Sequence, residues 1–333
     1  MTRVTVLGAG SWGTTFAMVL ADSGHPVTLC ARRDDVRDEI NADHVNSAYL
    51  PDVVLPGNVV ATTDVAAACQ DAEVLALAVP AQTLRANLEQ LRQHLDERVL
   101  LLSLIKGLEL ETLDRMSQVI AEVTGAGPER IAVVSGPNLA REIAERQPTA
   151  TVVASEHEPT ADRIASLLWA RYMRPYTNTD LVGVELGGVL KNVIALAVGV
   201  AEGMGLGDNT KATIITRGLA ETTRLALALG GRATTMAGLA GVGDLVATCA
   251  SSLSRNRSFG AALGRGLGPA EAVKVARYTA EGAKSARPVL ELADRHGVDM
   301  PIAEQVVALL EGRIGLHDIG ERLLYRPLKA EGN

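Results

Sequence analysis

One lysine lies among small residues in a stretch with helical spacing. Residues 183–200 read GVELGGVLKNVIALAVGV, and Lys191 is the only charged residue on the face formed by Val184, Gly187, Gly188, Lys191, Ala195, Val198 and Gly199, because residues three and four positions apart are neighbours on a helix. Desolvation disfavours the charged form of a lysine and lowers its pKa towards the range where it exchanges protons near neutral pH. We therefore take Lys191 as a candidate acid–base group. The alternative is a core lysine that extends to solvent or pairs with a carboxylate.

Two later segments carry groups that suit a phosphorylated ligand. The segment SRNR at residues 254–257 falls at an expected helix start. There Ser254 can cap the helix, while Arg255 and Asn256 bring a charge and paired donors to the end that attracts anions. A plain surface turn is the alternative for this segment. Asp244 ends a glycine-rich turn over residues 237–244, where it could cap a helix or orient a lysine or a substrate hydroxyl.

The elements that must position these groups begin with a glycine-rich turn. A short apolar strand over residues 3–7 is followed by GAGSWG, with glycines at Gly8, Gly10 and Gly13, and then by a helix over residues 14–23. Such a turn lets the backbone approach a pyrophosphate, whose charge is met by the helix N-terminus. We predict a dinucleotide site here; a glycine turn that serves only close packing is the alternative.

Two arginines follow the second expected strand, which covers residues 26–30. A site that prefers NAD usually offers a carboxylate to the ribose hydroxyls at this place, but the chain offers Arg32 and Arg33 before two aspartates. Guanidinium groups suit a 2′-phosphate, so NADP(H) is favoured and NAD(H) is possible. The alternative is a solvated cluster of charges at the end of a strand.

Strands and helices alternate up to residue 180, and helices alone follow. Further strands are expected over residues 59–61, 73–79, 98–103, 131–135, 149–155 and 173–177, and one of the helices between them over residues 112–123. The order predicts an α/β, Rossmann-like doubly wound sheet with parallel, right-handed crossovers over residues 1–180, which would bind the dinucleotide. Ligands sit beyond the carboxyl ends of such strands, where Pro80 and Lys106 fall. Residues 181–333 are expected to form an all-α domain that binds the substrate.

Composition excludes several classes of protein. The 32 basic and 39 acidic residues give a net charge of −7 without a long basic run, so we expect no nucleic-acid partner. Three widely spaced cysteines suit neither a disulfide framework nor a metal site, and they favour a cytoplasmic location. The longest apolar stretch, around Lys191, is interrupted by polar residues and is expected to be too short to span a bilayer.

Several segments together resemble the bacterial NAD(P)-dependent glycerol-3-phosphate dehydrogenase family. They span almost the whole chain and read GAGSWGTTFA, NSAYLP, KGLE, SGPNLAREI, GVELGGVLKNVIALAVG, DNTKATIITRGLAE, GLAGVGDLVATC, SSLSRNRSFG and the pair EG at residues 281–282. The resemblance implies reversible reduction of dihydroxyacetone phosphate to sn-glycerol 3-phosphate for glycerophospholipid synthesis. We also expect a homodimer.

The resemblance also implies roles for individual residues. Lys191 would be the catalytic residue, giving a proton to the C2 oxygen in reduction and taking one in oxidation. The residues implied for substrate binding are Lys106, Gly136, Asn138, Lys191, Asp244, Ser254, Arg255 and Asn256. Those implied for the cofactor are Gly8, Gly10, Ser11, Trp12, Gly13, Arg32, Arg33, Lys106, Ala140, Arg255, Thr279 and Glu281.

The chain departs from the family pattern at a few places. Asn138 stands where Ser or Thr is usual, Leu139 where Phe is common, and Thr279 where an apolar residue is commoner. An asparagine can still donate and accept hydrogen bonds. Two other functions remain open at this point: a dehydrogenase of similar architecture that acts on a hydroxy acid, and a non-catalytic sensor of dinucleotides.

Overall fold

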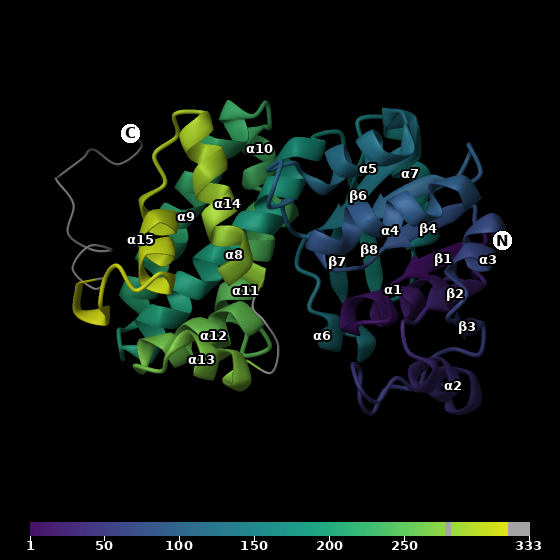
Figure 1. The fold of residues 1–333 in the computed structure, drawn as a ribbon, viewed down its shortest axis with the longest axis horizontal. Helices are drawn as coiled ribbons and strands as arrows, with labels where there is room; N and C mark the ends of the chain where they lie inside the picture. Colours follow the sequence, from purple (N-terminus) through teal and green to yellow (C-terminus); the bar gives the residue numbers. More distant parts are fainter. Residues whose placement is uncertain (277–280, 319–333) are drawn as a thin grey trace.

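An eight-stranded sheet and a bundle of helices form the two halves of the computed structural model, which describes residues 1–276 and 281–318. In Figure 1 the sheet and the helices that cover it lie on the right, and the bundle, from α8 onward, lies on the left. The strands lie in the order β3-β2-β1-β4-β5-β6-β7-β8. They are β1 Val4–Leu7, β2 Val27–Cys30, β3 Val59–Thr62, β4 Val74–Leu77, β5 Leu100–Ser103, β6 Ile131–Ser135, β7 Thr149–Ala154 and β8 Met173–Asn178.

Helices cover both faces of the sheet, so the central strands β1, β4, β5 and β6 are buried along their whole length. Alternate residues of β4 and β5 point into two separate cores, with Ala76 and Leu102 in one and Leu75 and Leu101 in the other. The helices that connect the strands are α1 Ser11–Asp22, α2 Asp34–Asp43, α3 Val65–Gln70, α4 Leu84–Leu91, α5 Met116–Thr124, α6 Ala140–Ala144 and α7 Glu158–Leu167. This arrangement confirms the predicted doubly wound α/β fold followed by helices.

One pair of neighbouring strands is antiparallel, which corrects the expectation of a parallel sheet. Strand β7 runs antiparallel to β6, with Val134 opposite Val153, while the other neighbouring pairs are parallel. A parallel crossover must carry the chain back along the whole strand. The connection here holds only α6, which is five residues long, so β7 starts at the edge where β6 ends.

A loop replaces the first turn of one predicted helix. The helix expected over residues 112–123 begins at Met116, and residues 104–115 form a loop in which a bridge between Leu108 and Arg115 closes residues 108–115. The amide of Glu109 also donates to the carbonyl of Asp114 at 2.9 Å. Lys106 therefore lies on a loop, residues 104–115, that we call the Lys106 loop, two residues before its closed part and not on a regular element.

The second half is built around α8, Leu181–Gly203, which packs against α9, α12 and α14 and also contacts β6. The other helices are α9 Asp208–Ala228, α10 Ala233–Met236, α11 Asp244–Ala250, α12 Arg255–Gly264, α13 Pro269–Val275, α14 Glu281–Arg295 and α15 Pro301–Leu310, with a π-helical turn over Leu239–Gly243. Strand β8 ends two residues before Asp180, the N-cap of α8. The division into two domains at residue 180 stays a prediction.

The apolar stretch around Lys191 was expected to be too short to span a membrane, and this expectation about its length was wrong. Residues 181–203 form a 23-residue helix that is long and apolar enough to cross a bilayer, as is the helical stretch over residues 233–250. Of the most apolar part of α8, however, 94% is buried inside the protein. A central core helix has the same length and composition as a membrane span, and α8 is such a helix.

Candidate active site

The glycine-rich turn places bare backbone at the start of α1. Gly8 has φ +115°, and a Cβ there would lie 2.8 Å from the carbonyl oxygen of Ala78. A Cβ on Gly13 would lie 1.9 Å from the carbonyl oxygen of Gly8, so neither position tolerates a side chain. A Cβ on Gly10 would meet nothing within 4 Å, and no side chain caps α1. The turn can therefore admit an anion to the helix N-terminus.

A buried asparagine holds this turn, and the sequence reasoning did not single it out. The Asn46 amide nitrogen donates to the carbonyl of Ala9 at 3.0 Å and to the hydroxyl of Thr14 at 2.8 Å. Asn46 belongs to the segment NSAYLP, between α2 and β3. An asparagine in a loop carries no periodic signal, so only its tertiary partners identify its task.

A single cavity of about 960 Å³ runs from the glycine turn to α8 and the start of α12. Fifteen of the predicted site residues line it: Gly8, Gly10, Ser11, Trp12, Gly13, Arg32, Arg33, Lys106, Asn138, Ala140, Lys191, Ser254, Arg255, Asn256 and Glu281. Gly136 and Asp244 lie behind its wall, where each contacts Lys106. Thr279 lies outside the described residues.

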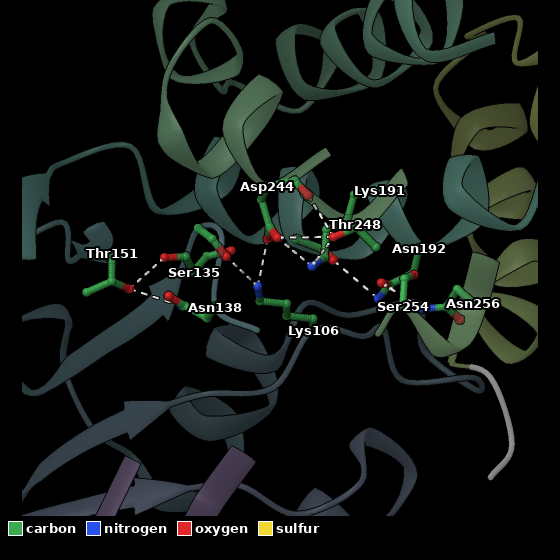
Figure 2. Close-up of polar contacts among 12 residues, drawn as sticks. Lys106, Ser135, Asn138, Thr151, Lys191, Asn192, Asp244, Thr248, Ser254 and Asn256 are labelled. Atoms are coloured by element: carbon green, nitrogen blue, oxygen red, sulfur yellow. Dashed lines mark hydrogen bonds and ion pairs between the residues drawn. The ribbon is translucent and has the colours of Figure 1, made fainter. Parts of the chain in front are cut away.

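Two lysines meet at one buried aspartate at the inner end of the cavity (Figure 2). Lys191 Nζ donates to Asp244 Oδ1 at 2.5 Å, and Lys106 Nζ donates to Oδ2 of the same carboxylate at 2.6 Å. The Asp244 side chain is 1% exposed. Two positive charges and one negative charge leave a net positive centre, which favours a substrate oxygen that gains negative charge.

Burial lowers the pKa of Lys106 to about 8, because the ammonium loses its hydration; Asp244 opposes this effect and the nearby Lys191 adds to it. Its Nζ also donates to the carbonyl of Gly136 at 3.0 Å, which fixes the direction of the side chain. Lys106 can therefore change its charge near neutral pH while it faces the cavity.

Thr248 is a second partner of Lys191, and the sequence reasoning missed it. Lys191 Nζ donates to its hydroxyl at 2.9 Å, and that hydroxyl lies 2.6 Å from the carbonyl of Asp244, to which it donates. The available signal was the spacing of four residues between Asp244 and Thr248 on α11, which puts both on one face of the helix.

The phosphate-binding candidates lie at the start of α12, as the sequence predicts. Ser254 is the N-cap, and its hydroxyl accepts a hydrogen bond from the amide of Arg257. Arg255 lines the cavity. Arg257 instead pairs with Glu202 of α8 at 2.7 Å, so the two arginines of the SRNR segment have different surroundings.

The Asn256 side chain is held by backbone and side-chain partners. Its amide nitrogen donates to Asn192 Oδ1 at 2.9 Å, and its oxygen accepts from the amide of Gly282 at 2.8 Å. Asn256 thus joins α8, α12 and the start of α14 next to Lys191. Asn192, which neighbours Lys191 in the sequence, is a further residue that the sequence reasoning did not name.

Asn138 has a fixed orientation although it departs from the family pattern. Its amide nitrogen donates to Thr151 Oγ1 at 3.0 Å, and Thr151 Oγ1 donates to the carbonyl of Ser135 at 3.0 Å (Figure 2). Because Thr151 gives its single hydroxyl proton to the carbonyl of Ser135, its oxygen can only accept from Asn138, so the NH₂ group of Asn138 must face it. The oxygen of Asn138 is buried and finds no partner in the described part of the chain.

Arg32 and Arg33 lie at the opposite end of the cavity, beside the end of β2. Arg33 forms an ion pair with Asp35. No ion pair of Arg32 occurs within residues 1–276 and 281–318. Arg32 is therefore the better placed of the two to meet an added phosphate.

Glu281 adds a carboxylate to the wall of the cavity. Its side chain is exposed to the cavity, while the protein around it raises its pKa above the ordinary range because the carboxylate loses hydration; Arg255 and Lys191 oppose the shift. Among the described residues no group of three or more His, Cys, Asp or Glu side chains could hold a metal ion.

Comparison with known proteins gives matches over nearly the whole chain. A family model described as the N-terminus of NAD-dependent glycerol-3-phosphate dehydrogenase matches residues 3–161, and its C-terminal counterpart matches residues 180–321. A glycerol-3-phosphate dehydrogenase (NAD(P)+) of Streptomyces griseus is 56% identical over 330 residues, which cover 99% of this chain and 98% of that protein. Another, of Thermobifida fusca, is 58% identical over 93% of both chains.

A solved structure of similar shape supports the same match. The crystal structure of a glycerol-3-phosphate dehydrogenase of Coxiella burnetii superposes with a TM-score of 0.93 at 37% identity. The alignment covers 98% of this chain and 99% of that chain.

Proposed function

Because the chain belongs to the NAD-dependent glycerol-3-phosphate dehydrogenase family, we propose that Lys191, Lys106 and Asp244 are the groups with which it converts its substrate. The chain is an oxidoreductase that uses NAD or NADP. It interconverts dihydroxyacetone phosphate and sn-glycerol 3-phosphate, which supplies glycerophospholipid synthesis.

The proposed cofactor site is the outer part of the cavity. The open Cα of Gly10 and the uncapped N-terminus of α1 suit a pyrophosphate. Arg32 suits a 2′-phosphate, in line with a preference for NADP(H). The rest of the proposed set is Gly8, Ser11, Trp12, Gly13, Arg33, Lys106, Ala140, Arg255, Thr279 and Glu281. When bound, the nicotinamide supplies or accepts the hydride equivalent that the reaction moves.

The proposed proton transfer belongs to Lys191. In reduction, C2 of the ketone gains a hydride, and its oxygen takes a proton from the Lys191 ammonium, which then recovers one from solvent. Lys106 polarises the same carbonyl, and Asp244 holds both ammonium groups at 2.5 and 2.6 Å. In oxidation, neutral Lys191 takes the hydroxyl proton.

The proposed place of the substrate phosphate is the start of α12. Ser254, Arg255 and Asn256 line the cavity there, and an arginine at a helix N-terminus suits a dianionic phosphate. Gly136 and Asn138 would hold the other end of the substrate. We also propose that residues 1–180 bind the dinucleotide and residues 181–333 the substrate, in a cytoplasmic homodimer.

The observation that carries this proposal is the pair of lysines on one buried aspartate at the end of the cavity. The test is the initial rate of NADPH oxidation with dihydroxyacetone phosphate, beside NADH and beside unphosphorylated dihydroxyacetone. Turnover that requires the phosphate is the expected result. A protein that binds NADPH but turns over neither compound would instead direct the search to hydroxy acids or to a sensor function.

A further inference from the structure

A second carboxylate, Glu185, connects the two lysine-bearing segments at a distance from the cavity. It lies on α8, six residues before Lys191, which corresponds to about 9 Å along the helix axis. Its side chain is 5% exposed. The residue does not line the cavity, and the proposed mechanism gives it no chemical role.

The partners of Glu185 lie at the end of the Lys106 loop and at the start of α5. Arg115 donates to Oε2 of Glu185 at 2.5 Å, the amide of Ser117 donates to Oε1 at 2.9 Å, and the Ser117 hydroxyl donates to Oε2 at 2.6 Å. Arg115 is the N-cap residue of α5 and Ser117 is its second residue. The carboxylate therefore sits at a helix N-terminus, where the backbone dipole favours a negative charge.

Arg115 is linked to the neighbourhood of Lys106 by a bridge. It pairs with Leu108, two residues after Lys106, and this bridge closes residues 108–115. The far side of the loop is held by Arg85, which pairs with Glu109 at 2.8 Å. A displacement of Arg115 therefore acts through the bridge on Leu108, which is two residues from Lys106.

Lys106 also lies directly against α8. A Cβ on Gly188 would approach the Cγ of Lys106 to 3.3 Å and the hydroxyl of Ser135 to 2.8 Å. Because Gly188 has no side chain, Lys106 packs directly against the backbone of α8, so the position of α8 affects that of Lys106. Small shifts matter here, since Lys106 and Lys191 must both reach Asp244.

We infer that Glu185 is a positioning residue, which sets the separation of Lys106 and Lys191 by tying α8 to the Lys106 loop through Arg115 and Ser117. This inference rests on the proposed function, because it assigns Glu185 a part in the same reaction. A misplacement of reacting groups by about 1 Å can cost roughly a hundredfold in rate.

The test is a double-mutant cycle with Glu185→Gln and Lys106→Met. Glu185→Gln keeps the volume and removes the charge, and we expect kcat to fall about tenfold to a hundredfold with NADPH affinity unchanged. In the Lys106→Met background the same substitution should change kcat less than about twofold, because the coupled partner is gone. Equal losses in both backgrounds would overturn the inference.

A matched control separates positioning from simple destabilisation. Glu221 is a buried carboxylate on α9 that accepts a hydrogen bond from the amide of Ile302 at 2.9 Å. Neither Glu221 nor Ile302 belongs to the segments that carry Lys106 and Lys191. Glu221→Gln should lower the melting temperature and leave kcat within about twofold at a temperature where the protein is folded. A loss of kcat equal to that of Glu185→Gln would also overturn the inference.

A milder variant covers the case in which Glu185→Gln does not fold. Ser117→Ala removes the 2.6 Å hydroxyl contact to Glu185 and the 3.0 Å hydrogen bond that this hydroxyl accepts from Arg115, but keeps the amide contact to Glu185. We expect a smaller fall in kcat with the same dependence on Lys106. An unchanged kcat in every folded variant contradicts the positioning role. Absence of turnover in the unsubstituted protein would instead contradict the proposed function.

Discussion

Lys106 Nζ lies 2.6 Å from Asp244 Oδ2, although the two residues are 138 positions apart in the sequence. The lysine comes from a loop after β5 and the aspartate from the first turn of α11. The contact thus joins the sheet to the helical half at the inner end of the cavity. Lys191 reaches the same carboxylate from α8, so the site depends on three segments that are separate in sequence.

Replacement of Lys191 by methionine should remove turnover and keep cofactor binding. Methionine retains the apolar stem but cannot donate a proton, so kcat should fall by about a hundredfold to ten-thousandfold. NADPH affinity, measured by quenching of protein fluorescence, should stay within about twofold because the glycine turn is untouched. Lys211→Met, at the start of α9, is the control with normal turnover. Near-normal kcat in Lys191→Met would exclude its role as acid.

The rate of ketone reduction should depend on pH through Lys106. Burial lowers the pKa of Lys106 to about 8. Below this pH the residue is charged and can polarise the carbonyl, and above it the charge is lost. The profile of kcat/KM, which reports groups of the free enzyme, should therefore fall as the pH rises above about 8.

Lys106→Arg tests this assignment, because a guanidinium stays charged throughout the accessible pH range. We expect the decrease above pH 8 to disappear in Lys106→Arg, with a lower plateau caused by the altered geometry. Lys106→Met should be slow at every pH. If both variants keep a decrease at the same pH, another group causes it.

Arg32→Ala should weaken NADPH binding more than NADH binding. Loss of a charge-assisted contact to the 2′-phosphate corresponds to roughly 1 to 3 kcal/mol, or about fivefold to 150-fold in Kd. Arg33→Ala is the matched variant, and it should have a smaller effect because Arg33 pairs with Asp35. Calorimetric titration with both cofactors measures the ratio. Equal weakening of NADPH and NADH would show that Arg32 does not contact the 2′-phosphate.

Local patterns predicted most of the fold, because buried parallel strands and apolar helices leave periodic signals. They did not predict the antiparallel β7, since strand direction depends on the short α6 in the preceding connection. The start of α5 was also misplaced, because Arg115 and Ser117 are fixed by Glu185, 70 and 68 residues away. Contacts over such separations leave no local trace in a single sequence.

The residues that line the cavity could be predicted where a residue type has a special chemical property. Lys191 and the glycines of the first turn are of this kind. Thr248, Asn192 and Thr151 are ordinary polar residues whose importance comes from their partners: Lys191, Asn256 and Asn138. Family resemblance named the residues expected to touch ligands, but not those that orient them.

Thr151→Val should impair recognition of the hydroxyl group on C1 of dihydroxyacetone phosphate. Thr151 fixes the Asn138 amide so that its nitrogen is engaged and its oxygen remains without a partner among the described residues. A buried acceptor without a donor costs free energy, and a substrate hydroxyl that donates to it would remove this cost. Valine has the same shape as threonine but no hydroxyl, so the side-chain amide of Asn138 can rotate and exchange the positions of its oxygen and nitrogen.

The comparison substrate is hydroxyacetone phosphate, which has the same ketone and phosphate but lacks the C1 hydroxyl. In Thr151→Val, kcat/KM for dihydroxyacetone phosphate should fall about fivefold to thirtyfold, equivalent to roughly 1 to 2 kcal/mol. For the compound without the hydroxyl it should change less than about twofold, because no contact to that group is lost. A structural defect would lower both values equally, and that outcome would refute the orienting role of Thr151. A selective loss would mean that the Asn138 oxygen recognises the C1 hydroxyl, a task that Thr151 makes possible.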